Sequence, residues 1–118
     1  MNLFMKKLNL AITGCLGRMG QQIIKTSNKD KEVKLVTLTE NKLVNKKING
    51  IIPELNSEKA LAKADVIIDF TIPKCTFEVL KIASKLKKKV VIGTTGFTKK
   101  EESIIKKFSK RTAILKDW

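Results

Sequence analysis

The stretch "ITGCLGRMG" at residues 12–20 decides the fold, because it places three glycines at every third position: Gly14, Gly17 and Gly20. The residues before it, 7–13, alternate in polarity and then run apolar, as a strand buried on both faces does. Behind the first glycines the apolar spacing becomes helical. We therefore expect a strand over 7–13, a tight glycine turn, and a helix over 17–27.

The rest of the chain continues the alternation of strand and helix patterns. Strands are expected over 33–39, 64–71, 88–96 and 112–115. Helices are expected over 57–63, from Pro73 onwards, and over 98–110. The polar segment 41–56 has no clear period and is expected to be an irregular connection. This alternation predicts an α/β fold, with a parallel sheet covered on both faces by helices.

The apolar positions of the three longer helices predict which side chains face the sheet. These positions are Met19, Ile23 and Ile24; then Phe77, Leu80, Ala83 and Leu86; then Ile104, Ile105 and Phe108. In the last helix, Thr98 and Glu101 stand at the spacing of a capping box, which marks the helix start.

Length and composition limit the class of protein. The 118 residues suit one domain, and a hydrophobic content of 42% spread along the chain favours a folded core. Cys15 and Cys75 lie far apart in a chain without histidine, so neither a zinc site nor a dithiol redox motif is expected. The first 14 residues lack a signal-peptide core and no run is long enough to span a membrane. We expect a cytoplasmic protein.

The formal net charge of +14 raises the alternative of a nucleic-acid binder. The charge is almost entirely lysine, with only Arg18 and Arg111 carrying guanidinium groups, and the chain has no tyrosine. Because the lysines are scattered and are not gathered with stacking aromatic residues, we expect no nucleic-acid partner.

The glycine turn suggests a phosphate site. Backbone N–H groups at a helix N-terminus favour an anion, and the missing side chains let a pyrophosphate approach closely. The spacing is G-x-x-G-x-x-G, not G-x-G-x-x-G, so the motif alone is only moderately specific. Glu40 strengthens it, because an acid about 20 residues later, at the end of the second strand, accepts hydrogen bonds from the adenosine ribose. The structural alternative is a solvated acid before a loop.

Two further loops end at the same edge of the expected sheet. The segment "DFTIP" at 69–73 ends the third strand, and Gly93, Thr94, Thr95 and Gly96 end the fourth. Small hydroxyl residues there can donate to a phosphate or to the nicotinamide amide, although ordinary tight turns with threonine caps would look the same. Lysines beyond Glu40 suit either a ribose hydroxyl or a 2′-phosphate, so NADPH and NADH both remain open as cofactor.

Three motifs, "ITGCLGRMG", "DVIIDFTIP" and "VVIGTTGF", in this order and spacing, resemble the N-terminal domain of the 4-hydroxy-tetrahydrodipicolinate (dihydrodipicolinate) reductases. The resemblance implies a Rossmann-like fold and NAD(P)H-dependent reduction of 4-hydroxy-tetrahydrodipicolinate in lysine and diaminopimelate biosynthesis. By position it assigns pyrophosphate binding to Gly14, Cys15, Leu16, Gly17, Arg18 and Met19. It assigns the adenosine ribose to Glu40, followed by Asn41, and the nicotinamide side to Phe70, Thr71, Gly93, Thr94 and Thr95.

The sequence departs from the family pattern in two ways. Where an arginine often follows the ribose acid, this chain has Asn41 and then Lys42, which weakens a preference for NADPH. Family members are about twice as long, and their substrate domain carries a His-His-x-x-Lys segment that has no counterpart here. The chain ends "AILKDW", where Asp117 and Trp118 differ from the family.

We therefore expect residues 1–118 to form a single dinucleotide-binding domain, with the substrate and oligomerisation domain absent. No catalytic residue and no metal site are expected in it. The resemblance implies that the substrate would bind only with the missing domain and that the full-length proteins form homotetramers. The alternative function is a catalytically inactive, stand-alone dinucleotide-binding module.

Overall fold

The computed structural model describes residues 7–117. The first six residues of the N-terminal segment, and Trp118, lie outside the described residues. The strands are β1 (Leu8–Thr13), β2 (Val33–Glu40), β3 (Glu54–Leu55), β4 (Val66–Asp69), β5 (Lys89–Ile92) and β6 (Ile114–Lys116). The helices are α1 (Arg18–Asn28), α2 (Glu58–Leu61), α3 (Pro73–Leu86) and α4 (Lys99–Phe108).

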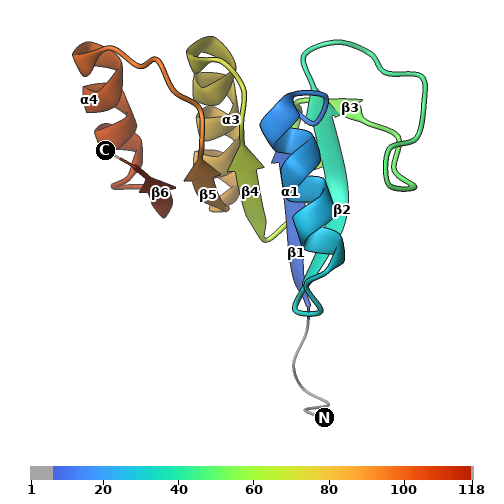
Figure 1. The fold of residues 1–118 in the computed structure, drawn as a ribbon. Helices are drawn as coiled ribbons and strands as arrows, with labels where there is room; N and C mark the ends of the chain where they lie inside the picture. The colour runs from blue at the N-terminus through green and yellow to red at the C-terminus, as the bar shows by residue number, and fades with distance from the viewer. Residues whose placement is uncertain (1–6, 118) are drawn as a thin grey trace.

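The strands form one sheet, in the order β3-β2-β1-β4-β5-β6, and every pairing between them is parallel (Figure 1). The chain runs outward from β1 to β2 and β3, then crosses back to β4 on the other side of β1. Strand order therefore reverses between β1 and β4, and the loops that leave these strands part there to open a crevice. The predicted α/β fold with a Rossmann-like parallel sheet is confirmed.

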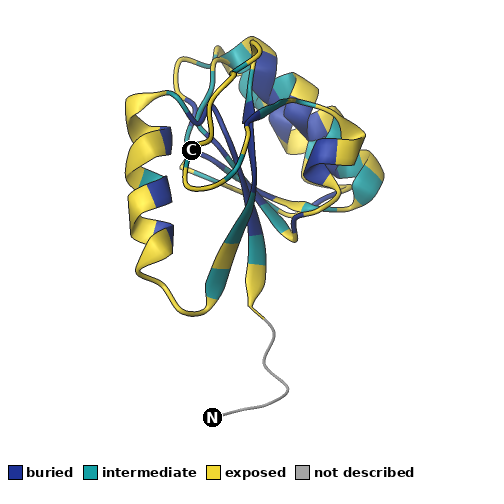
Figure 2. Ribbon diagram, turned by 90° about the vertical axis from the view of Figure 1, so that its right-hand side faces the viewer, coloured by how far each residue is buried: buried dark blue, intermediate teal, exposed yellow. Residues whose placement is uncertain are grey.

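Apolar side chains form two layers, one on each face of the sheet. Neighbours in β1 point to opposite faces: Ala11 joins the layer under α2, α3 and α4, whereas Ile12 joins the layer under α1. Figure 2 shows helices on both sides of the sheet, with their buried residues turned towards it. Both faces are thus covered by helices, as the alternating pattern predicts.

None of the helices within residues 7–117 is long and apolar enough to cross a bilayer.

The polar segment 41–56 is more ordered than the sequence pattern suggested. Ile48 and Ile51 exchange backbone hydrogen bonds of 2.8 and 3.0 Å across a turn in which Asn49 and Gly50 both have positive φ. Asn-Gly is the typical sequence for such a turn. The segment then adds the short strand β3 beside the end of β2. The expectation of a wholly irregular connection was wrong, because these short elements lack a hydrophobic period.

Two helix residues expected in the core lie at the surface. Met19 lies in the first turn of α1, is 51% exposed, and belongs to neither apolar layer. Ile104 is 37% exposed because its neighbour Ile105 takes the buried position on α4, and adjacent residues of a helix face different directions.

Candidate functional site

The glycine turn between β1 and α1 is packed tightly against its neighbours at two of its three glycines. Gly14 has φ +74°, and a Cβ atom there would lie 2.2 Å from the Phe70 carbonyl oxygen. A Cβ atom at Gly20 would lie 2.3 Å from the Gly14 carbonyl oxygen. The fold itself therefore requires glycine at both positions.

Gly17 is different, because the fold does not require a glycine there. It is exposed, its φ of −69° suits any residue, and a Cβ atom would meet only the Gly14 carbonyl oxygen, at 3.4 Å. Gly17 is the N-cap residue of α1, yet no side chain caps this helix end and its first turn contains no acid. No described side chain therefore caps the backbone N–H groups of the first turn, which leaves them available to an anion.

Glu40 ends β2 directly beside the glycine turn. Its Oε2 atom accepts a hydrogen bond of 2.9 Å from the Leu16 backbone N–H, and its Oε1 atom accepts one of 3.1 Å from Asn41 N–H. The carboxylate is therefore held in place at the rim of the crevice. Each carboxylate oxygen keeps a further lone pair for a ligand hydroxyl.

A hollow opens between the glycine turn and the loops that follow β2, β3 and β4. It is lined by Gly14, Gly17, Glu40, Asn41, Asn56, Phe70, Thr71, Ile72 and Cys75. Sequence reasoning named six of these residues, placed Ile72 at this edge within the segment 69–73 without giving it a role, and missed Asn56 and Cys75. Asn56 could have been found only by recognising β3, because it follows that strand at the same sheet edge and accepts a 2.5 Å hydrogen bond from the Thr39 hydroxyl.

Gly93, Thr94 and Thr95 follow β5 at the same sheet edge but line a second hollow, together with Phe97 and Lys116. A Cβ atom at Gly93 would lie 1.9 Å from the Phe70 ring, so this glycine makes room for that ring. Phe70 therefore lies between the two hollows. The structure brings these predicted residues to one edge but divides them between two neighbouring spaces.

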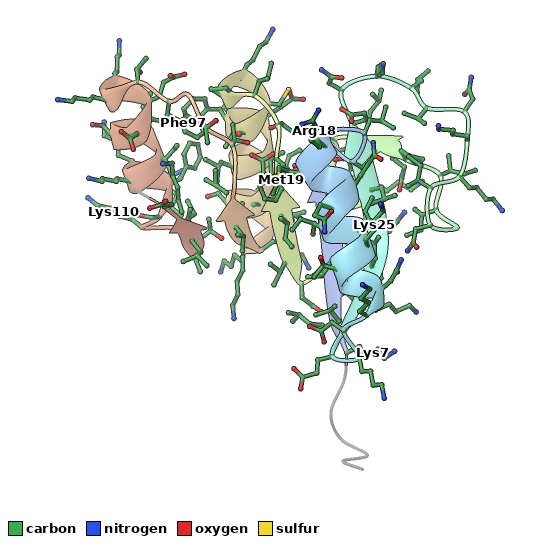
Figure 3. All side chains as sticks on the ribbon, in the orientation of Figure 1. Lys7, Arg18, Met19, Lys25, Phe97 and Lys110 are labelled. Atoms are coloured by element: carbon green, nitrogen blue, oxygen red, sulfur yellow. The ribbon has the colours of Figure 1, made fainter. Side chains whose placement is uncertain are left out.

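The other predicted residues surround the turn without lining either hollow. Cys15 is fully buried; burial and the nearby Glu40 charge raise the pKa of its thiol to about 11, so it stays protonated at neutral pH. Leu16 packs against the apolar layer under α1. Arg18 and Met19 lie exposed on the first turn of α1 (Figure 3). Among residues 7–117, no group of three or more His, Cys, Asp or Glu side chains is arranged to hold a metal ion.

Asp69 is a buried carboxylate at this edge that sequence reasoning missed. It ends β4, is fully buried, and accepts hydrogen bonds from the hydroxyls of Thr13, Thr71, Thr76 and Thr94. The signal was present in the sequence, because an acid within the apolar run "DVIIDF" has to be satisfied by polar partners once it is buried.

Comparisons with known proteins show the family to which the chain belongs. A family model described as "Dihydrodipicolinate reductase, N-terminus" matches residues 8–117. The 4-hydroxy-tetrahydrodipicolinate reductase of Pelagibacter ubique is 66% identical over 112 residues, which are 95% of this chain and 43% of that protein. The enzyme of the same name from Bdellovibrio bacteriovorus is 39% identical over 94% of this chain and 44% of its own length. The chain thus spans less than half of these curated relatives.

Solved structures point the same way. A dipicolinate-bound dihydrodipicolinate reductase from Paenisporosarcina sp. TG-14 superposes with a TM-score of 0.66 at 26% identity, over 88% of this chain and 43% of its own. Homoserine dehydrogenase from S. aureus gives a TM-score of 0.75 at 16% identity, over 95% of this chain and 32% of its own, a likeness of fold alone. The family match over residues 8–117 decides the relationship. The chain belongs to the dihydrodipicolinate reductase family and corresponds to its N-terminal part.

Proposed function

We propose that this chain binds NADH or NADPH across the crevice at its sheet edge, as the cofactor-binding part of a reductase. The full-length enzyme would reduce 4-hydroxy-tetrahydrodipicolinate to tetrahydrodipicolinate in lysine and diaminopimelate biosynthesis. The observation that carries the proposal is the uncapped N-terminus of α1 at Gly17, with the fixed carboxylate of Glu40 beside it. An anion site next to a hydroxyl acceptor matches a pyrophosphate joined to a ribose.

The pyrophosphate would lie over the turn from Gly14 to Met19. Gly14, Cys15, Leu16 and Gly17 bring their backbone close to it, while Arg18 and Met19 contribute the first N–H groups of α1. The exposed guanidinium of Arg18 adds positive charge at the same helix end. Glu40 would accept hydrogen bonds from the adenosine ribose, and Asn41 would line that side of the hollow. The exposed Lys42 suits either a 2′-hydroxyl or a 2′-phosphate neighbour.

The nicotinamide half would lie beyond Gly14, towards β4 and β5. Phe70 and Thr71 line the first hollow there, and Gly93, Thr94 and Thr95 line the second. When bound, the reduced nicotinamide supplies the hydride. This chain's own residues bind and orient the cofactor, and we assign none of them to proton transfer.

Substrate binding is assigned to the part of the relatives that this chain does not span. Hydride transfer requires the substrate carbon to be held against the nicotinamide, and such positioning contributes much of the rate enhancement. We expect no useful turnover from residues 1–118 alone. We further propose a cytoplasmic homotetramer for the full-length enzyme; the two buried free cysteines suit a reducing compartment.

The test is a titration of the folded chain with NADH and NADPH, followed by nicotinamide fluorescence. We expect saturable binding, which Glu40→Ala weakens about tenfold through loss of a charged hydrogen-bond acceptor. Glu54→Ala is the matched control, because Glu54 lies on the neighbouring strand β3 and forms an ion pair of 2.9 Å with Lys63 outside the hollow. A flat titration with folded wild-type protein would contradict the proposal.

A further inference from the structure

The ring of Phe70 lies directly against Gly93. A Cβ atom at Gly93 would be 1.9 Å from the ring atom Cε1 and 2.4 Å from both Cδ1 and Cζ, which are its nearest atoms beyond the chain neighbours. They are consecutive atoms of one ring edge, so the ring fills the space that a side chain at position 93 would need. The contact joins the ends of β4 and β5, which are neighbouring strands.

The packing requires Gly93 for its missing side chain and not for its backbone conformation. The φ of Gly93 does not lie in the left-handed region, unlike that of Gly14. The backbone at Gly93 therefore accepts any residue, and alanine at such a position normally stabilises a protein, because it restricts the unfolded chain. The obstacle to a side chain at this position is the Phe70 ring.

Hydrogen bonds hold the backbone in place on both sides of this contact. The Gly93 N–H donates to the Asp69 carbonyl oxygen over 2.8 Å. The Phe70 N–H donates to the Thr13 carbonyl oxygen over 3.3 Å, and the Phe70 carbonyl oxygen lies where Gly14 has no side chain. A side chain added at Gly93 would therefore displace the Phe70 ring, which can rotate, and not the two strand ends.

The Phe70 ring lies outside the two apolar layers of the core. Phe70 is half-buried and belongs to neither layer. It lines the first hollow, whereas Gly93 lines the second. The contact between these two residues is therefore at the boundary between the hollows, where it can act on a ligand that extends across both.

We propose that Gly93 is a positioning residue: its missing side chain leaves the space in which the Phe70 ring lies, and this fixes the boundary along which the nicotinamide half of the cofactor would bind. The inference rests on the proposed dinucleotide function. The competing explanation is that Gly93 is a glycine because the cofactor itself approaches its backbone. The two explanations differ in whether the effect of a side chain at position 93 depends on Phe70.

A double-mutant cycle tests this dependence with wild type, Gly93→Ala, Phe70→Ala and the double variant. Calorimetry measures the affinities for NADH and for ADP, which lacks the nicotinamide half. Gly93→Ala should weaken NADH about tenfold through the displaced ring and leave ADP unchanged. In the Phe70→Ala background, the same change should alter NADH affinity by less than about twofold, because no ring remains to be displaced.

Urea unfolding of the same four proteins, without ligand, gives a second readout. Gly93→Ala should lower the unfolding midpoint in the wild-type background, because the ring is forced out of its place. In the Phe70→Ala background it should raise the midpoint, since only the stabilising effect of alanine on the unfolded chain remains. Should Gly93→Ala fail to fold, recovery of folded protein in the double variant shows the same dependence.

The control is Phe97→Ala, which removes the other aromatic ring beside Gly93. Phe97 lines the second hollow with Gly93, but its ring packs edge-on against Phe77, with the ring centroids 6.1 Å apart. In the Phe97→Ala background, Gly93→Ala should therefore cost as much NADH affinity as it does in wild type. A rescue by Phe97→Ala equal to that by Phe70→Ala would show that the contact with Phe70 is not the cause.

The remaining outcomes separate this inference from the proposed function. If Gly93→Ala weakens NADH equally with and without the Phe70 ring, or if its effect on the midpoint does not depend on that ring, the inference is wrong. Equal losses of ADP and NADH affinity also contradict it, because the whole site is then disturbed. If folded wild-type protein binds neither ADP nor NADH, the proposed function fails, together with the inference.

Discussion

The N-termini of α1 and α4 lie at the same edge of the sheet, but side chains cap α4 and leave α1 uncapped. At α4, the Thr98 hydroxyl accepts the Glu101 N–H over 3.1 Å, and the Glu101 carboxylate accepts the Thr98 N–H over 2.9 Å. Glu102 adds a second acid to that first turn. At α1, the N-cap residue is Gly17, no side chain caps the end, and Arg18 begins the helix.

The difference shows that side chains decide which helix end is available to a ligand. The backbone dipole favours an anion at both ends. At α4 the protein supplies the anion itself through Glu101, which stabilises the helix. At α1 no side chain caps the helix, although such a cap typically contributes about 1 kcal/mol of stability. The first N–H groups of α1 are thus left available to a ligand. The glycine turn therefore serves packing at Gly14 and Gly20, whereas at Gly17 the packing does not require a glycine and we propose a role in binding.

The largest expected effect comes from giving α1 an acid at its N-cap, as in Gly17→Asp. The new carboxylate occupies the anion site, so NADH affinity should fall about a hundredfold or more, which corresponds to about 2.7 kcal/mol. The backbone at Gly17 accepts any residue, so the free energy of unfolding should stay constant or rise by a few tenths of a kcal/mol, ~0.3.

Calorimetric titration and urea unfolding of the same samples measure both effects. Ser57→Asp is the control, because it places the same charge at the N-cap of α2, where Ser57 already accepts the Ala60 N–H. Retained NADH affinity in Gly17→Asp would show that the N-terminus of α1 is not the anion site.

A smaller effect, on stability alone, is expected from removing the cap of α4. Thr98→Ala deletes one half of the capping box and should lower the free energy of unfolding by about 1 kcal/mol. NADH affinity should not change, because Thr98 lines neither hollow. Thr98→Ser should restore stability. A loss of NADH affinity in folded Thr98→Ala would remove the contrast between the two helix ends.

The smallest effect concerns Cys15, beneath the glycine turn. Burial and, after it, the nearby Glu40 charge raise the pKa of its thiol from the ordinary value of 9.0 to about 11 in the folded chain. Between these values the unfolded chain has lost more protons, so the folded state loses stability as pH rises from 9 towards 11. Wild type should be more stable than Cys15→Ala by about 1 kcal/mol at pH 7, and this advantage should fall across the window and reverse towards its upper end. Thermal unfolding at several pH values measures it, and a constant difference would show that burial does not raise the pKa.

The sequence predicted the strands and helices whose side chains follow a clear period. The capping box at Thr98 and the buried strands on either side of the crevice were visible because each is a local pattern. Hydrophobic spacing wrongly predicted that Met19 is buried, because an apolar residue in the first turn of a helix can lie beyond the edge of the core. It also missed β3, because two residues cannot display a period.

The candidate site was only partly predictable for a related reason. Glycine spacing located the turn, and the distance along the chain to Glu40 located the acid. The apolar run around Asp69 marks it as a buried acid, but its partners could not be predicted, because they come from residues as far apart as Thr13 and Thr94 and no local pattern relates them. The split of Phe70 and Gly93 between two hollows depends on side-chain packing in the same way.

The position of β1 in the sheet has a consequence for the order of assembly during synthesis. Thr13 in β1 and Asp69 in β4 are direct register partners, although they lie 56 residues apart. A chain that emerges N-terminus first can pair β1 with β2 early, but the other side of β1 stays unpaired until β4 leaves the ribosome. Asp69 then acquires its last donor only when Thr94 arrives. The rim of the crevice and the second half of the sheet should therefore form together, after β1 and β2 have paired, as one cooperative unit.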